Sequence, residues 1–206
     1  MTSALLARLE LRPMTLADLD RVPLRCHGSR EEIAARIADL GAAAILAFDG
    51  DRHVAQLQFR RYAPQRRSPT GIWDPLYWGD FGEHAPALPE NSIAVFCYHV
   101  GQTEDSDARD AAYQGHGIAT ALLDALVVWA RDHGIAALVA KCTPPPYAVM
   151  SFMGGLSAAR YAERGFTLLS SWLEPQVLEV VRERRLVPGD EDAVAAATVG
   201  CCVKRL

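Results

Sequence analysis

The hydrophobic positions near the start of the chain follow a helical period. Apolar residues recur at the spacing of one helix face between positions 33 and 40, and Gly41 ends the pattern. Ser29 and Glu32 form a capping-box sequence at the start of this helix, because each side chain can bond the other's backbone amide. Before it, the patterns predict a short strand and a short helix, over residues 9–12 and 15–19.

Two strand-like apolar runs follow, on either side of the turn sequence Asp49-Gly50-Asp51. They predict an antiparallel hairpin of residues 44–48 and 54–62. Residues 93–100 form a strongly apolar third run, which predicts another strand. Residues 118 to about 133 return to helical spacing, with a predicted sheet-facing stripe of Ile118, Ala121, Leu122, Ala125, Val128 and Trp129.

Strand and helix patterns alternate through the second half of the chain. Residues 135–141 predict a buried strand, and the prolines at 144–146 break the chain after it. The remaining predicted elements are a helix at 153–164, a strand at 166–172, a helix at 175–185 and a strand at 198–206. This order indicates a single mixed α/β (α+β) domain over residues 1–206, with one crossover unit near its middle.

The composition is typical of a folded globular protein without a basic field. Of the 206 residues, 50% are hydrophobic and 22% are charged, and the net charge is -4. This balance argues against duplex nucleic acid as the main partner. We expect a cytoplasmic protein with no membrane partner, because the N-terminal region does not resemble a signal peptide and residues 118–130 are too short to span a bilayer.

The cysteines are odd in number, and their spacing resembles neither a zinc site nor a disulfide framework. We therefore expect reduced thiols and no metal. Cys97 and His99 would share one face of a regular strand, which suggests either a nucleophilic pair or a small buried thiol. The buried thiol is the preferred interpretation. The five cysteines are Cys26, Cys97, Cys142, Cys201 and Cys202.

The sequence Gln114-Gly115-His116-Gly117 leads directly from a loop into the helix at 118. A helix start leaves backbone amides unpaired, and these amides favour an anion such as a pyrophosphate. Glycines let a phosphate approach closely, and Thr120 offers a further hydroxyl. The turn is not a P-loop, because no Gly-Lys-Ser/Thr follows, and Thr120 stands where a Rossmann fingerprint has glycine or alanine.

This turn resembles the Gln/Arg-x-x-Gly-x-Gly/Ala motif of GNAT-type N-acetyltransferases, which matches Gln114 to Ala119. A second family feature, a helix that ends in Tyr-x-x-x-Gly-Phe, matches Tyr161, Gly165 and Phe166. The resemblance implies a GNAT-like fold with a central mixed, mostly antiparallel sheet of about seven strands flanked by helices. It implies acetyl-CoA, or another acyl-CoA, as co-substrate, bound by Tyr98, His99, Val100, Gln114, Gly115, His116, Gly117, Ile118, Ala119 and Thr120.

The resemblance also implies roles in proton transfer. Tyr161 would protonate the departing thiolate, although its spacing alone is equally typical of a core tyrosine. His99 is a candidate base for the amine, because histidine is the side chain whose ordinary pKa lies nearest neutrality; a solvent-facing strand histidine is the equal alternative. Glu83, Glu90 or a chain of water molecules are further candidates for the base.

Other candidates concern the acceptor and the nucleotide. The loop at 64–90 carries Trp73, Tyr77, Trp78 and Phe81, which either line an acceptor pocket or, as we prefer, cover the sheet. The acidic side chains before the turn either attract an amine or, as we prefer, form a solvated loop: Glu104, Asp105, Asp107 and Asp110. For Arg160 we prefer a solvated helix face over a phosphate contact.

Some positions depart from the family pattern. Gly154 stands where many relatives have an asparagine that contacts the pantetheine arm. The loop at 101–112 is longer than usual, and the segments 64–90 and 175–197 resemble additions. These departures bear on the identity of the acceptor more than on the identity of the co-substrate.

The sequence therefore predicts an N-acetyltransferase that transfers an acetyl (acyl) group from acetyl-CoA to a primary amine by direct attack in a ternary complex. The acceptor would be a small molecule or a peptide, and the protein a monomer or homodimer. The alternatives are a non-catalytic acyl-CoA-binding or regulatory module of the same fold, and a nucleotide-binding enzyme of another fold.

Overall fold

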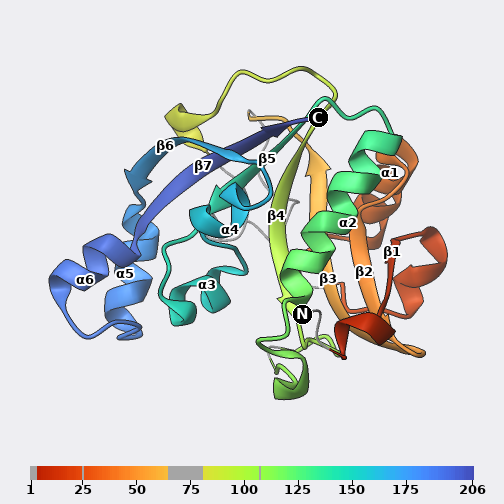
Figure 1. Cartoon of the computed structure of the whole chain (residues 1–206), viewed down its shortest axis with the longest axis horizontal. Coiled ribbons are helices and arrows are strands. Elements are labelled where there is room, and N and C mark those ends of the chain that lie inside the picture. Colours follow the sequence, from red (N-terminus) through yellow and green to blue (C-terminus); the bar gives the residue numbers. More distant parts are fainter. Residues whose placement is uncertain (1–3, 25, 65–80, 107) are drawn as a thin grey trace.

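A computed structural model describes residues 4–24, 26–64, 81–106 and 108–206 of the chain. One open sheet of seven strands runs through it in the order β1-β2-β3-β4-β5-β7-β6 (Figure 1). Neighbouring strands are antiparallel except β4 and β5, so the predicted mixed, mostly antiparallel sheet is confirmed. The strands are β1 (Glu10–Pro13), β2 (Ala44–Asp49), β3 (Arg52–Arg61), β4 (Ser92–Val100), β5 (Ala137–Cys142), β6 (Thr167–Leu173) and β7 (Thr198–Arg205).

Helices cover both faces of this sheet. Along β2, Ile45 and Ala47 belong to the cluster of buried side chains that includes helix α2, whereas Leu46 and Phe48 pack with residues of α1 and the segment before it. This division follows from the alternation of side chains along a strand. The helices are α1 (Arg30–Leu40), α2 (Ile118–Asp132), α3 (Tyr147–Met153), α4 (Ala158–Ala162), α5 (Pro175–Glu183) and α6 (Asp190–Ala196), with short 3-10 helices that include η2 (Leu16–Asp20).

Helix α1 begins with the predicted capping box. The Glu32 amide donates to Ser29 Oγ at 3.2 Å, and the Ser29 amide donates to Glu32 Oε2 at 2.8 Å. Gly41 ends the helix in a left-handed conformation at φ +89°. These local signals therefore place both ends of α1 correctly.

The stripe predicted for α2 is partly wrong. Val128 is 56% exposed, whereas Leu123, Leu126 and Val127 are buried. The helix turns these larger side chains toward the sheet, because they remove more apolar surface from water than the alanines of the predicted stripe. In the described part of the chain, no helix has the length and apolar character that crossing a membrane requires.

The helix predicted at 153–164 is shorter than expected, because only α4 forms within that range. Helix α3, which precedes it, was not predicted, and it ends at Gly154, which adopts the left-handed conformation at φ +59°. At Gly155 an added Cβ would lie 2.7 Å from Thr143 Cγ2, and the Thr143 amide donates to Leu156 O. The segment between the helices is therefore held as extended chain beside the end of β5. Helix α6 was not predicted.

Strands β4 and β5 separate partway along their length. Their parallel pairing runs from Ser92 beside Ala137 to Val95 beside Ala140, while β4 continues to Val100. Beyond this point the Tyr98 amide donates to Gly154 O at 2.9 Å, so the segment after α3 takes the place of β5. This separation positions the site described next.

Candidate functional site

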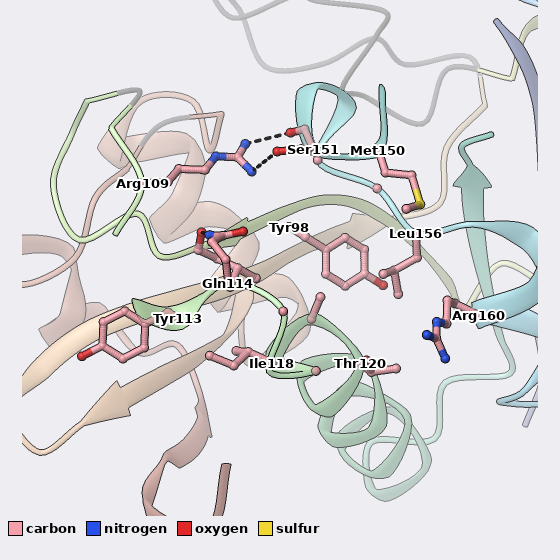
Figure 2. Close-up of a pocket in the computed structure, with 16 residues that line it drawn as sticks. Tyr98, Arg109, Tyr113, Gln114, Ile118, Thr120, Met150, Ser151, Leu156 and Arg160 are labelled. Carbon is pink, nitrogen blue, oxygen red and sulfur yellow. Dashed lines mark hydrogen bonds between the residues drawn. The ribbon is translucent and has the colours of Figure 1, made fainter. Parts of the chain in front are cut away.

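A cavity of about 350 Å³ opens where β4 leaves β5, and Figure 2 shows its walls. They are formed by the end of β4, the segment that leads into α2, the end of α3 and the start of α4. Most of the residues predicted to bind the co-substrate line it: Tyr98, Val100, Gln114, Gly115, Gly117, Ile118, Ala119 and Thr120. The cavity thus brings the end of β4 and the glycine turn together.

The glycine turn lies at the N-terminus of α2. Gly115 and Gly117 have φ of +74° and +79°, which side chains other than glycine adopt rarely. An added Cβ on Gly115 would meet no atom within 4 Å, so the space above the turn is open. His116, between them, is exposed. The turn therefore presents the first amides of a helix of 15 residues to an open space, which suits an anion.

Gln114 joins this turn to the end of β4. Its Nε2 donates to Val100 O at 2.5 Å. Gly101 follows Val100 at φ +77°, and an added Cβ there would lie 2.8 Å from Gln114 Nε2. The absence of a side chain at Gly101 is therefore what lets Gln114 reach the strand.

Arg109 links the loop before the turn to α3 across the cavity. Its Nη1 donates to Ser151 Oγ at 3.1 Å and its Nη2 donates to Ser151 O at 2.9 Å (Figure 2). No sequence pattern indicated this wall, since α3 itself was not predicted. The lining residues that sequence reasoning missed as site residues are Arg109, Met150, Ser151, Gly155 and Leu156.

The backbone of β4 faces the separation at Tyr98 and Val100. The Gly101 amide donates to Val54 O on β3, so in an alternating ladder Tyr98 and Val100 direct their backbone groups away from β3. Two of these groups already have partners within the chain, namely the Tyr98 amide and the Val100 carbonyl. The Val100 amide thus points toward the separation.

Tyr161 on α4 is 1% exposed, and its hydroxyl lies 3.1 Å from the hydroxyl of Tyr98. Among the described residues that line the cavity, Tyr98 is present and Tyr161 is not. Figure 2 shows the Tyr98 ring extending from β4 into the region beside Leu156 and Arg160. Burial raises the pKa of Tyr161 well above its usual value, and the neighbouring Tyr98 raises it further. Burial also raises the pKa of Tyr98, which its bond with Tyr161 partly offsets. Both phenols therefore keep their protons at neutral pH.

His99 lies on the opposite face of β4 from Tyr98 and is 5% exposed. Its Nε2 is 3.0 Å from Cys97 Sγ, and its Nδ1 contacts Gln102 Oε1. Cys26 joins this group from the segment before α1. The predicted base His99 therefore lies on the α1 side of the sheet, and it does not line the cavity.

Two more buried histidines lie near this group. Burial, with a smaller contribution from Arg36, lowers the pKa of His27 to about 3. Burial, with a smaller contribution from His99, lowers the pKa of His53 to about 4. His27 Nε2 has Gln56 Oε1 at 2.9 Å. Both imidazoles are thus neutral near pH 7.

Gly154 occupies the position where the family pattern has asparagine. An added Cβ would lie 3.0 Å from Cys97 Sγ and 3.3 Å from the carbonyl oxygen of Tyr98. The chain therefore has no room for a side chain there without a shift, and the Gly154 carbonyl bonds the Tyr98 amide instead.

The remaining candidates are placed as follows. Phe81 is buried against β4, β5 and β7, whereas Trp73, Tyr77, Trp78 and Asp107 lie outside the described residues. Asp110 accepts from the Ala112 amide and pairs with Arg52. Arg160 pairs with Glu163 at 3.1 Å with its side chain 60% exposed, and it also lines the cavity. The other acidic candidates are exposed: Glu83, Glu90, Glu104 and Asp105.

Comparison with known proteins identifies a family and a shared fold. A model of the acetyltransferase (GNAT) family matches residues 20–153. Mosquito arylalkylamine N-acetyltransferase like 5b shares the fold at 14% identity and a TM-score of 0.53, over 96% of this chain and 100% of that one. An acetyltransferase of the GNAT family from Streptococcus pneumoniae does so at 14% identity and a TM-score of 0.52, over 96% and 99% of the two chains.

A third solved structure is GphF, a GNAT-like decarboxylase in complex with isobutyryl-CoA, at 15% identity and a TM-score of 0.51 over 95% and 98% of the two chains. At these identities the likeness concerns the fold alone. A search of curated proteins found no match to the sequence.

Proposed function

Because the chain belongs to the acetyltransferase (GNAT) family, we propose that it transfers an acetyl group from acetyl-CoA to a primary amine. The acceptor would be a small molecule or a peptide, and the amine would attack the thioester directly while both substrates are bound. The observation that carries the proposal is the glycine turn at the start of α2, which opens into a cavity at the separation of β4 and β5.

The cavity residues fit the parts of acetyl-CoA. The pyrophosphate would lie over Gly115, where the space above the turn is open, and would accept from the first amides of α2. Arg160 on the rim offers a charge for a phosphate. The pantetheine arm would follow β4, where the Val100 amide is directed toward the separation.

The two tyrosines would supply the proton that the departing thiolate needs. A thiol has a pKa of about 8.5, so a neutral phenol of higher pKa can act as its general acid only when the transfer is direct and well positioned. Tyr161 is the predicted donor, and Tyr98 lies between it and the cavity. We propose that the pair acts together, with Tyr98 next to the thiolate and Tyr161 bonded behind it.

The acceptor amine must lose a proton before or during its attack. His99 remains the proposed base, and its place on the opposite face of β4 from Tyr98 means that the amine would approach from the α1 side of the sheet. We expect the protein to be cytoplasmic, as a monomer or a homodimer.

The test is to mix the purified chain with acetyl-CoA and a panel of small primary amines and peptides, and to follow the release of free thiol. We expect saturable binding of acetyl-CoA and amine-dependent release. Binding without release would favour a non-catalytic module. Release of carbon dioxide from a carboxyacyl-CoA without an amine would favour a decarboxylase, the activity of GphF. No binding of acetyl-CoA would contradict the proposal as a whole.

A further inference from the structure

Three side chains with metal-binding atoms meet on the α1 side of β4. One ligand atom from each of Cys26, Cys97 and His99 lies within 4.8 Å of the other two. Cys97 and His99 come from adjacent positions on one face of the strand, with Sγ and Nε2 3.0 Å apart. Cys26 comes from the segment between η2 and α1, far away in sequence, which is why linear spacing predicted no metal site.

Hydrogen bonds fix which nitrogen of His99 faces the two sulfur atoms. Gln102 Nε2 donates to Ser106 O, so its Oε1 is the atom that faces His99. This oxygen only accepts, and His99 Nδ1 must therefore carry the proton. The Nε2 lone pair is left directed at Cys97. Metal-binding histidines are commonly held in this way, by an acceptor on the second ring nitrogen.

The charge of the group suits a divalent ion in a buried place. Cys97 and His99 are 2% and 5% exposed, and Cys26 is half-buried. Two thiolates and one divalent cation sum to zero, so the bound site would bury no net charge. Two thiolates and an imidazole prefer Zn²⁺ over oxygen-seeking ions such as Mg²⁺ and Ca²⁺.

One further observation points the same way. Cys26 has φ of +62°, a conformation that costs a cysteine about 1 kcal/mol or more and persists where the surroundings hold it. A metal bond would hold Cys26 in place.

We propose that Cys26, Cys97 and His99 bind one Zn²⁺ ion, with the fourth position open to water or to a substrate atom. This site goes beyond the proposed acetyl transfer and does not depend on it. It has one consequence for that reaction: His99 Nε2 cannot bind the ion and act as the base at the same time.

The test uses the full chain, reduced, stripped with a chelator and dialysed, and then titrated with ZnCl₂ or CoCl₂. We expect one zinc per chain by elemental analysis, a thiolate-to-cobalt charge-transfer band in the near ultraviolet, and a higher melting temperature with zinc. Cys26→Ser and Cys97→Ser should each abolish the cobalt band. Cys142→Ser is the matched control, because Cys142 lies beside Cys202 in another part of the sheet and should leave the band unchanged.

Cys26→Ser carries the test if Cys97→Ser does not fold, since Cys26 lies in a loop. A wild-type chain that binds neither ion, or a band that survives Cys26→Ser, would overturn the proposal. Acetyl-CoA binding, measured on the same samples, reports separately on the proposed function.

Discussion

The hydroxyl groups of Tyr98 on β4 and Tyr161 on α4 lie 3.1 Å apart, within bonding distance of each other. One of them donates to the other, and only Tyr98 lies among the described residues that line the cavity. If Tyr161 supplies the proton, as the family pattern implies, the proton reaches the cavity through Tyr98. The geometry thus gives Tyr98 a part in the proposed proton transfer, whereas the sequence had suggested it only as one of the residues that bind the co-substrate.

We expect Tyr98→Phe and Tyr161→Phe each to lower the rate of thiol release about 100-fold, with little change in the affinity for acetyl-CoA. Tyr62→Phe is the matched control, because its hydroxyl donates to Pro86 O, away from the cavity. Steady-state kinetics with saturating amine measure the effect. A loss in Tyr161→Phe alone would make Tyr161 the direct donor, and full activity in both variants would remove the phenols from the mechanism.

A pair of glycine substitutions separates binding from stability. Gly115 and Gly134 lie at opposite ends of α2 with φ of +74° and +66°, and an added Cβ meets no atom within 4 Å at either position. Alanine should therefore cost about 1–2 kcal/mol of unfolding free energy at both, through backbone strain alone. Only Gly115→Ala places a methyl group over the proposed pyrophosphate position.

We expect Gly115→Ala to weaken acetyl-CoA binding at least tenfold in calorimetry, about 1.4 kcal/mol, and Gly134→Ala to leave it unchanged. Equal affinity in the two variants would mean that the phosphates do not lie over this turn. Urea unfolding of both proteins checks that the cost in stability is the same.

Much of this site was predictable because its signals are local. The capping box of α1, the turn between β2 and β3 and the glycines before α2 each act within a few residues, and each element formed where it was expected. The cavity was harder to predict from the sequence, because one of its walls is formed by the end of α3. The sequence at 147–153 carries no cap of its own that would mark a helix, and Gly154, which had been predicted near the start of a helix, ends α3 instead.

The group on the other face of β4 could not be predicted for a different reason. Cys26 reaches Cys97 only because the segment before α1 packs against β4, and no pattern in a single sequence records that contact. The face of α2 that packs on the sheet was likewise decided by the sizes of Leu123, Leu126 and Val127 against the sheet, which periodicity does not weigh.

Asp18 gives the fold a pH dependence that does not involve the cavity. Its carboxylate accepts from Arg12 and from the amide and hydroxyl of Thr15. Burial alone raises its pKa, but these bonds together outweigh burial and lower the pKa to about 2. Since the pKa in the unfolded chain is about 3.9, the ion pair stabilises the fold above that pH and its contribution disappears as the pH falls toward 2.

We therefore expect Asp18→Asn to lower the unfolding free energy by about 2 kcal/mol at pH 7, and the difference from wild type to shrink below pH 4. Asp20→Asn serves as the control, because the side chain of Asp20 is 79% exposed and its pair with Arg30 contributes little. Urea unfolding at a series of pH values measures both. A difference that stays constant from pH 7 to pH 2 would show that the carboxylate charge is not the cause.

Gly154 and Cys97 should be coupled through space, because an added Cβ on Gly154 would lie 3.0 Å from Cys97 Sγ. We expect Gly154→Ala to cost about 2–3 kcal/mol, from strain at φ +59° and from this contact. In a Cys97→Ala background the sulfur is gone, and the same substitution should cost less by about 0.5–1 kcal/mol. Urea unfolding of the metal-free proteins gives the four free energies of the cycle.

Gly134→Ala in the same background should be additive, because nothing lies within 4 Å of its Cβ. Additivity at Gly154 as well would mean that Tyr98 O or the backbone strain, and not the sulfur, is what requires glycine beside the cavity.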